Sequence, residues 1–230
     1  MHTPGVKNHA IFTDARAQTL ASRLSIGFSP QEAWREAPAH FSDHTLVIDG
    51  HPVMEDWEDG YMRMLAQVAA SGRGTVLEVG FGMGISAGYI QSAGVDRHII
   101  IEANRDVYRK LEAFAAEHPS VTPLFGFWEE AASTLPSGSI NGILFDTYPL
   151  TEADIHRNHF PFFKEAHRLL TPDGTLTYYS DEIDDYSTEH LEALTSAGFT
   201  RIGKSLCEVV PPEGCAYWTS RTLLAPVIQK

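Results

Sequence analysis

The chain has 230 residues, 43% of them hydrophobic, which suits one sizeable domain with its own core. Its formal net charge of −13 repels phosphate backbones, so we expect no nucleic acid partner. The apolar runs are strand-sized and the N-terminus lacks the layout of a secretory signal, so we expect no membrane partner and a cytoplasmic location.

The N-terminal part of the chain predicts a helix and then a pair of extended segments. Residues 12–26 have apolar side chains at helical spacing, and residues 44–54 are extended around a turn at Asp49 and Gly50. A further helix is predicted over residues 55–70. We interpret residues 1–43 as an N-terminal helical segment that covers the substrate, and residues 44–230 as a single domain. The N-terminal segment could instead pair two subunits of a homodimer.

From residue 75 onward, apolar runs alternate with helical patterns. Strands are predicted at 75–79, 98–103, 121–126, 140–147 and 174–180. Helices are predicted between and after them, at 85–93, 105–118, 128–136, 160–170 and 188–198. Two last strands form a predicted hairpin around residues 211–214. The alternation predicts an α/β fold with a doubly wound, mostly parallel seven-stranded sheet and a C-terminal antiparallel hairpin.

A glycine-rich turn follows the first strand of this series. Residues 77–86 read "LEVGFGMGIS", with Gly80, Gly82 and Gly84 at alternate positions, so the backbone can turn tightly and approach a ligand. The third glycine comes one residue too early for a dinucleotide fingerprint, which disfavours a pyrophosphate cofactor. Glu102 ends the second strand, where doubly wound folds place the carboxylate that accepts ribose hydroxyls. The pair predicts a nucleoside cofactor, the alternative being a plain turn beside a solvated acid.

The G-x-G-x-G spacing with this acid resembles that of the S-adenosylmethionine-dependent methyltransferases. Longer segments resemble one family among them, the guanidinoacetate N-methyltransferases: "VMEDWE" (53–58), "FDTYPL" (145–150) and "EVVPPEGCAYW" (208–218). The resemblance runs from about Trp34 to the C-terminus and leaves out the first thirty residues. It implies a Rossmann-like class I methyltransferase domain, S-adenosyl-L-methionine as cofactor and a small guanidino compound as substrate.

Carried over position by position, the resemblance implies two sets of site residues. Together with the glycine turn, it places the cofactor against Met54, Met62, Glu78, Gly80, Phe81, Gly82, Met83, Gly84, Ile85, Ser86, Glu102, Ala103, Asn104, Phe127, Trp128 and Asp146. It places the substrate against Trp34, Met54, Glu58, Asp146 and Tyr148. Glu58 and Asp146 are the implied catalytic residues.

The chemistry of guanidino methylation explains why two carboxylates, Glu58 and Asp146, are needed. A guanidinium is a planar cation without a free lone pair, and the sulfonium methyl donor is a cation as well. Carboxylates accept hydrogen bonds from the guanidinium fork and offset the repulsion between the two cations. Asp146 ends the fourth strand beside the cofactor, so we expect it to be the general base and Glu58 to hold the guanidinium.

No metal site is expected from the sequence. The histidines show no ligand spacing, and His156 and His159 near the site are expected to have structural roles. Cys207 and Cys215 are the only cysteines and are expected to be free thiols.

One stretch departs from the family that the chain resembles. Where that family presents a Leu-Thr-Ser stretch to the substrate carboxylate, residues 180–185 read "SDEIDD", with acids at Asp181, Glu182, Asp184 and Asp185. Such acids repel a carboxylate and suit an ammonium group. We therefore expect Asp181 and Glu182 to bind the α-amino group of free L-arginine, so that the product is N-methyl-arginine. The alternative is a solvated acidic loop, with guanidinoacetate or another guanidino compound as substrate.

Two further functions remain open from the sequence. A protein-arginine methyltransferase acts on the same group in a polypeptide, although the short N-terminal segment argues against a docking module. A cofactor-binding protein without catalysis is the alternative outside the enzymes. The presence of both Glu58 and Asp146 argues against it, because a sensor needs no proton acceptor.

Overall fold

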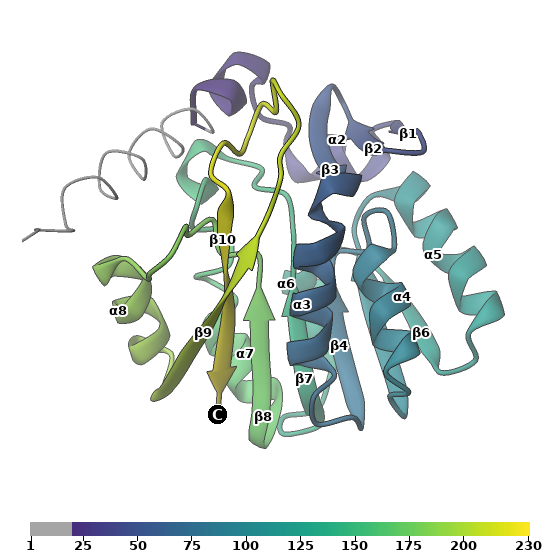
Figure 1. The fold of residues 1–230 in the computed structure, drawn as a ribbon. Helices are drawn as coiled ribbons and strands as arrows, with labels where there is room; N and C mark the ends of the chain where they lie inside the picture. Colours follow the sequence, from purple (N-terminus) through teal and green to yellow (C-terminus); the bar gives the residue numbers. More distant parts are fainter. Residues whose placement is uncertain (1–19) are drawn as a thin grey trace, which may run out of the picture.

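The computed structural model describes residues 20–230, and a sheet of seven strands forms the centre of this part of the chain (Figure 1). The strands lie in the order β6-β5-β4-β7-β8-β10-β9. Their bounds are Thr75–Val79 (β4), Arg97–Glu102 (β5), Val121–Phe125 (β6), Ile140–Phe145 (β7), Leu170–Tyr178 (β8), Arg201–Glu208 (β9) and Thr222–Gln229 (β10). The strands from β6 to β8 pair in parallel, whereas β10 is antiparallel to β8 and β9. The predicted sheet and its antiparallel hairpin are confirmed.

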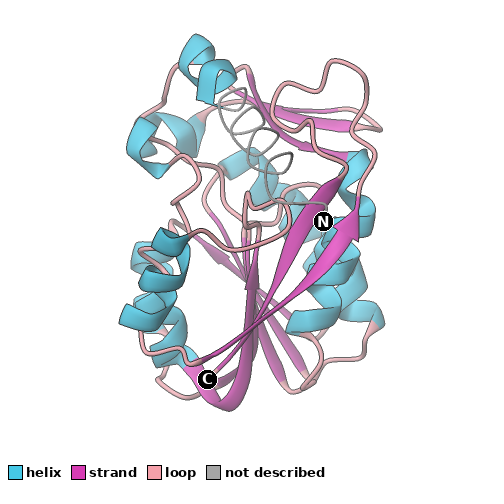
Figure 2. Ribbon diagram, turned by 60° about the vertical axis from the view of Figure 1, so that its left-hand side comes forward, coloured by secondary structure: helices cyan, strands magenta, loops and turns pink. Residues whose placement is uncertain are grey.

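Helices cover both faces of this sheet (Figure 2). One face carries α3 (Asp59–Ala69), α4 (Ile85–Ser92) and α5 (Arg105–Glu117), and the other carries α6 (Trp128–Ala131), α7 (Phe163–Leu169) and α8 (Thr188–Ser196). A cluster of buried residues fills each face, and successive residues of β4 alternate between the clusters, with Val76 in one and Leu77 in the other. A strand that is buried on both faces therefore reads as a continuous apolar run.

A smaller antiparallel sheet lies beyond the carboxyl ends of the parallel strands (Figure 1). It consists of β1 (Ala39–Phe41), β2 (Thr45–Ile48) and β3 (His51–Glu55), and it follows a helical stretch at residues 20–26 and α2 (Gln31–Glu36). The turn between β2 and β3 has positive φ at both Asp49 and Gly50, as the predicted hairpin requires. The short 3-10 helix η1 (Asp56–Glu58) then leads into α3.

Several element bounds differ from the prediction. The predicted helix of residues 12–26 is helical over residues 20–26, and the rest of it lies outside the described residues. Helix α7 begins at Phe163, three residues late, because turns occupy the chain up to residue 162. Strand β8 begins early, at Leu170, because a shift in its register with β7 accommodates Pro172.

Two observations concern the chemistry that the chain can support. Cys207 and Cys215 are free, buried thiols, as predicted. No helix within residues 20–230 is long and apolar enough to cross a membrane.

Candidate active site

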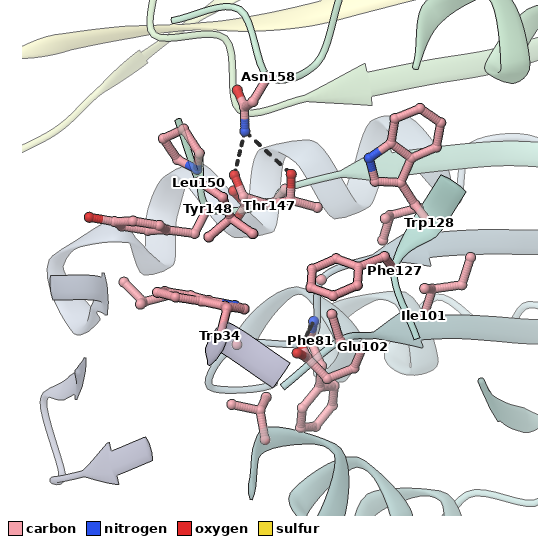
Figure 3. Close-up of a pocket in the computed structure, with 18 of the residues that line it drawn as sticks. Trp34, Phe81, Ile101, Glu102, Phe127, Trp128, Thr147, Tyr148, Leu150 and Asn158 are labelled. Carbon is pink, nitrogen blue, oxygen red and sulfur yellow. Dashed lines mark hydrogen bonds between the residues drawn. The ribbon is translucent and has the colours of Figure 1, made fainter. Parts of the chain in front are cut away.

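Two adjoining pockets lie at the carboxyl ends of β4, β5 and β7. The large pocket, which Figure 3 shows, is lined by residues from α2, β2 and β3, from the glycine turn, and from the ends of β5 and β7. The lining of the small pocket includes Arg23, Asp146, Tyr148, Tyr179, Asp181 and Tyr217. Asp146 and Tyr148 line both pockets, so a group bound in one lies next to a group bound in the other.

The glycine turn between β4 and α4 forms one wall of the large pocket. Gly80 and Gly82 have φ angles of +93° and +54°, which L side chains rarely adopt. A Cβ at Gly80 would lie 1.9 Å from the carbonyl oxygen of Asp146, and a Cβ at Gly82 would lie 3.0 Å from Met54 Sδ. Glycine is therefore required here both for the backbone conformation and for the close approach of neighbouring chain segments.

Glu102, at the end of β5, is fixed by backbone donors at the edge of the large pocket. Its Oε2 accepts a hydrogen bond from the Phe81 amide at 3.0 Å, and its Oε1 accepts one from the Asn104 amide at 2.7 Å. Burial raises the pKa of Glu102, and the backbone hydrogen bonds oppose that rise.

The structure brings nine of the predicted cofactor residues into the lining of the large pocket. They are Met54, Gly80, Phe81, Gly82, Glu102, Ala103, Phe127, Trp128 and Asp146. The other seven do not line it: Met62, Glu78, Met83, Gly84, Ile85, Ser86 and Asn104. Several of these lie directly behind the pocket wall and hold it in place.

Glu78 and Asn104 show how that support is built. Glu78 is fully buried, accepts a hydrogen bond from the Ser86 hydroxyl, and lies 2.9 Å from His98 Nε2. It thereby ties β4 to α4 and β5. Asn104 caps α5 and donates its side-chain amide to the carbonyl oxygens of Trp34 and Ala37, at 2.9 and 2.8 Å, which holds the segment after α2 against the pocket.

Aromatic side chains line the large pocket, and one of them, Tyr148, also lines the small pocket (Figure 3). The rings of Trp34 and Tyr148 stack with centroids 5.0 Å apart, and the Tyr148 hydroxyl lies 2.9 Å from His51 Nδ1. Asn158 donates hydrogen bonds to the carbonyl oxygen and the hydroxyl of Thr147, which fixes the chain just after Asp146.

Glu58 and Asp146 both have raised pKa values. Burial and then the Asp146 charge raise the pKa of Glu58 to about 8, against opposing hydrogen bonds from the Glu55 amide, Tyr217 and Tyr179. Burial and then the Asp181 charge raise the pKa of Asp146 to about 7. Both carboxyl groups therefore hold protons readily near neutral pH, and a cation placed beside them would favour their ionised forms.

The acidic run after β8 divides among three environments. Asp181 lines the small pocket, with Oδ2 at 3.3 Å from His156 Nδ1. Glu182 is fully buried outside the pocket lining, where Oε1 accepts from the Ser187 amide at 3.2 Å and faces His190 Nδ1. Asp185 pairs with Lys204 at the surface. Of the predicted substrate residues Asp181 and Glu182, only Asp181 lines the pocket.

Asp181 carries a charge into the small pocket. Burial acts to raise its pKa, but the hydrogen bond and charge of His156, with the charges of Arg23 and His159, bring the net pKa below the ordinary value. Asp181 and His156 both have positive φ, at 54° and 62°. Aspartate and histidine adopt this left-handed conformation more readily than most residues do.

The other predicted substrate residues also lie around these pockets. Trp34 and Met54 line the large pocket, and Tyr148 lines both. Glu58 is buried just behind the small pocket, where the Tyr179 hydroxyl donates to its Oε1 at 3.3 Å.

Sequence reasoning missed Arg23, Tyr179 and Tyr217 in the small pocket. Tyr179 follows β8 directly, and Tyr217 lies in a segment already recognised as similar to the family, so both could have been found. Arg23 lies in a stretch that carried no resemblance. His159 is buried and stacks on Tyr178, with centroids 4.7 Å apart, in agreement with its predicted structural role. Within the described part of the chain, no cluster of three or more histidine, cysteine or acidic residues could hold a metal ion.

Comparison with known proteins gives a family match and several relatives. The family model for guanidinoacetate N-methyltransferase matches residues 22–230. The protein arginine N-methyltransferase 2 of Yarrowia lipolytica is 35% identical over 144 residues, which are 59% of this chain and 29% of that protein. The Eremothecium gossypii protein of the same name is 38% identical over 136 residues, 56% of this chain and 32% of that one. The chain thus spans about a third of the length of these relatives.

Solved structures share the fold at low sequence identity. Spermidine synthase from Thermotoga maritima has a TM-score of 0.59 and 16% identity, covering 85% of this chain and 73% of its own. TYW2 from M. jannaschii, in complex with AdoMet, has a TM-score of 0.55 and 11% identity, covering 85% of each chain. At these identities the likeness shows the fold alone.

Proposed function

Because the chain belongs to the guanidinoacetate N-methyltransferase family, and is therefore an S-adenosylmethionine-dependent methyltransferase, we propose that it methylates the guanidino group of free L-arginine. The observation that carries the choice of substrate is Asp181, a carboxylate with a lowered pKa in the same small pocket as Asp146. An acceptor with a guanidinium at one end and an ammonium at the other has a carboxylate partner for each.

The large pocket fits the cofactor. Gly80, Gly82 and Glu102 all line it, which suits a nucleoside that approaches the backbone of the turn and donates from its ribose hydroxyls to the carboxylate. When bound, S-adenosylmethionine supplies an electrophilic methyl group on a positively charged sulfur. We assign its binding to Glu102, Phe127, Trp128 and the turn at residues 80–82, all of which line the large pocket.

Glu58 and Asp146 are proposed to hold the guanidinium. Each can accept hydrogen bonds from its planar fork, and the cation lowers the pKa values that burial has raised. The nitrogen that forms the new bond to carbon loses one proton, and Asp146 accepts it. Its pKa of about 7 suits a general base at neutral pH, and its place in both pocket linings puts it where the two sites meet.

Asp181 is proposed to select the amino end of the acceptor. L-Arginine carries an α-ammonium that can pair with it, whereas guanidinoacetate carries only a carboxylate that it repels. A hydrogen bond to a charged group contributes about 1.5–3 kcal/mol, which is roughly a tenfold to hundredfold preference. Glu182 takes no part in this selection, because its carboxylate faces His190 and lies outside the pocket lining.

Protein-bound arginine is the second candidate acceptor. It is favoured by the names of the curated relatives, which are protein arginine N-methyltransferases. An arginine within a polypeptide has no free α-ammonium, however, and would leave the Asp181 carboxylate without that partner. This contrast makes the free amino acid our first choice.

A panel of acceptors tests the proposal. L-Arginine, guanidinoacetate, agmatine and an arginine-containing peptide are incubated with a donor labelled in its methyl group, and kcat/KM is measured for each. We expect L-arginine to exceed the other three by at least about tenfold. A higher kcat/KM for guanidinoacetate or for the peptide contradicts the proposal and identifies the better acceptor.

The predicted homodimer through the N-terminal segment has its own test. Leu20, Leu24 and Ile26 are exposed on the helical stretch of residues 20–26, which would suit a partner subunit. Light scattering of the full chain at several concentrations measures the mass in solution. A mass of two chains that falls to one when these three residues are replaced by Ser supports the dimer, and a mass of one chain throughout contradicts it.

A further inference from the structure

The guanidinium of Arg23 lies in the small pocket with unused hydrogen-bond donors. Its Cζ is 3.9 Å from the centre of the Tyr148 ring, and Arg23 lines the small pocket together with Asp146 and Asp181. Its Nε and Nη1 atoms are buried and have no hydrogen-bond partner. Among the described residues, no carboxylate lies within salt-bridge distance of Arg23, although its charge acts to lower the pKa values of both aspartates.

Buried donors without acceptors are costly, so a native structure rarely keeps them without a reason. An arginine fork matches the two oxygens of a carboxylate, with which it forms a pair of parallel hydrogen bonds. The plane of the fork is held by Tyr148, which in turn stacks on Trp34. The chain thus presents a preorganised guanidinium, whose Nε and Nη1 donors lack hydrogen-bond partners, inside the pocket that we assign to the methyl acceptor.

We propose that Arg23 binds the carboxylate of the acceptor. The inference rests on the proposed function for the identity of that acceptor. L-Arginine then has a partner for each of its charged groups in or just behind the small pocket: Glu58 and Asp146 for its guanidinium, Asp181 for its α-ammonium, and Arg23 for its α-carboxylate. The acceptor supplies the oxygens that the buried Nε and Nη1 atoms lack.

A competing explanation is that Arg23 blocks the acceptor site. Its side chain is itself a guanidinium, and it lies near the acids that hold the guanidinium of the acceptor. A guanidinium that imitated the acceptor would pair with those carboxylates. Arg23 forms no such ion pair with Glu58, Asp146 or Asp181 in the described structure, and this favours a receptor over an internal mimic.

Matched acceptors, with and without the negative charge, separate these explanations. L-Argininamide keeps the guanidinium and the α-ammonium of L-arginine and replaces only the carboxylate. In Arg23→Gln, we expect kcat/KM for L-arginine to fall about tenfold to a hundredfold, mostly through KM, because a charge-assisted hydrogen bond to the carboxylate is lost. For L-argininamide we expect a change of less than about threefold. Arg23→Lys should recover part of the loss, because it keeps the charge without the fork.

Arg97 offers a control, because it is an exposed arginine at the start of β5, away from both pockets. Arg97→Gln should leave kcat/KM unchanged for both L-arginine and L-argininamide. Equal losses for L-arginine and L-argininamide in Arg23→Gln would show a structural role and overturn the proposal. An unchanged kcat/KM for both acceptors in Arg23→Gln would also overturn the proposal. An increased kcat/KM for both would overturn it too, because it would show that Arg23 blocks the pocket in the wild type.

The two proposals fail separately. If the wild-type protein prefers guanidinoacetate to L-arginine, the proposed substrate is wrong. Arg23 is then tested with guanidinoacetate and its neutral amide, guanidinoacetamide, in the same variants. A selective loss for the charged member of that pair supports the role of Arg23, and equal effects on both members overturn it.

Discussion

The large and small pockets share a wall but are built in different ways. The large pocket takes Glu102 and the glycine turn from the ends of two neighbouring strands, and the backbone fixes the carboxylate with hydrogen bonds. The small pocket gathers Arg23, Asp146, Asp181 and Tyr217 from distant parts of the chain, and its charged groups are incompletely paired. The protein's own backbone thus holds the carboxylate of the large pocket, whereas our proposal has the acceptor supply the missing partner in the small pocket.

The largest expected effect is on chemistry in the small pocket. Asp146→Asn keeps the shape of the side chain and removes its basicity, so the single-turnover rate should fall by about a thousandfold, within the usual contribution of a general base. Binding of S-adenosylhomocysteine, measured by calorimetry, should weaken far less, because Glu102 and the turn remain. A single-turnover rate within tenfold of wild type would contradict the assignment of Asp146 as the base.

The next effect concerns the large pocket. In Glu102→Gln, the side-chain amide has one oxygen and one NH2 group, so it can no longer accept hydrogen bonds from both the Phe81 and the Asn104 backbone amides. It also offers the ribose hydroxyls no charged acceptor. Calorimetric affinity for S-adenosylhomocysteine should fall about tenfold to a hundredfold. Glu117→Gln, at the exposed end of α5, is the matched control and should bind normally. Equal affinities in the two variants would remove Glu102 from the cofactor site.

A smaller effect should appear in the pH dependence of acceptor binding. The pKa values of Asp146 and Glu58 are about 7 and about 8, and a bound guanidinium favours the ionised forms, so binding at pH 7 should release protons. The affinity should therefore fall about five- to fiftyfold between pH 7 and pH 6, the lower value if binding displaces only the Asp146 proton and the higher value if it displaces the protons of both acids. Calorimetry in two buffers of different ionisation enthalpy measures the release. A flat affinity from pH 6 to pH 8 without proton release would contradict this coupling.

The smallest effect is on stability without ligand. In the folded protein the pKa of Glu58 is about 8, above the ordinary value of 4.5. The folded protein therefore holds the proton of the Glu58 carboxyl group more tightly than the unfolded chain does. Its favourable contribution is present below about pH 4.5 and is lost as the pH rises towards 8. Glu58→Gln resembles the protonated form, so its melting temperature should exceed that of wild type by a few °C at pH 8, and by less at pH 5.

Glu117→Gln again serves as the control and should show no such trend, because Glu117 is exposed. A difference in melting temperature between Glu58→Gln and wild type that stays constant from pH 5 to pH 8 would show that Glu58 is not held in its protonated form by burial.

The fold, and the place of Glu102 and the glycine turn in the lining of the large pocket, could be predicted from the sequence because their signals are local. Each buried strand is a short apolar run, and Glu102 and the glycines mark strand ends by spacing alone. The small pocket gives no such signal, since its residues meet only in the folded chain. The acidic run shows the limit best. Asp181 and Glu182 are neighbours of similar chemistry, yet the left-handed backbone at Asp181 sends one carboxylate into the pocket and the other towards His190. In a loop, the sequence has no helical or strand periodicity from which the direction of each side chain could be predicted.

The central claim is that Asp181 makes the acceptor site select an amino acid. The most direct measurement is the ratio of kcat/KM for L-arginine to that for guanidinoacetate in wild type, Asp181→Asn and Asp185→Asn. Asp185 belongs to the same acidic run but pairs with Lys204 outside the pocket. We predict a wild-type ratio of at least about ten, a fall of about tenfold in Asp181→Asn, and no change in Asp185→Asn. A wild-type preference for guanidinoacetate, or equal changes in the two variants, would contradict the account.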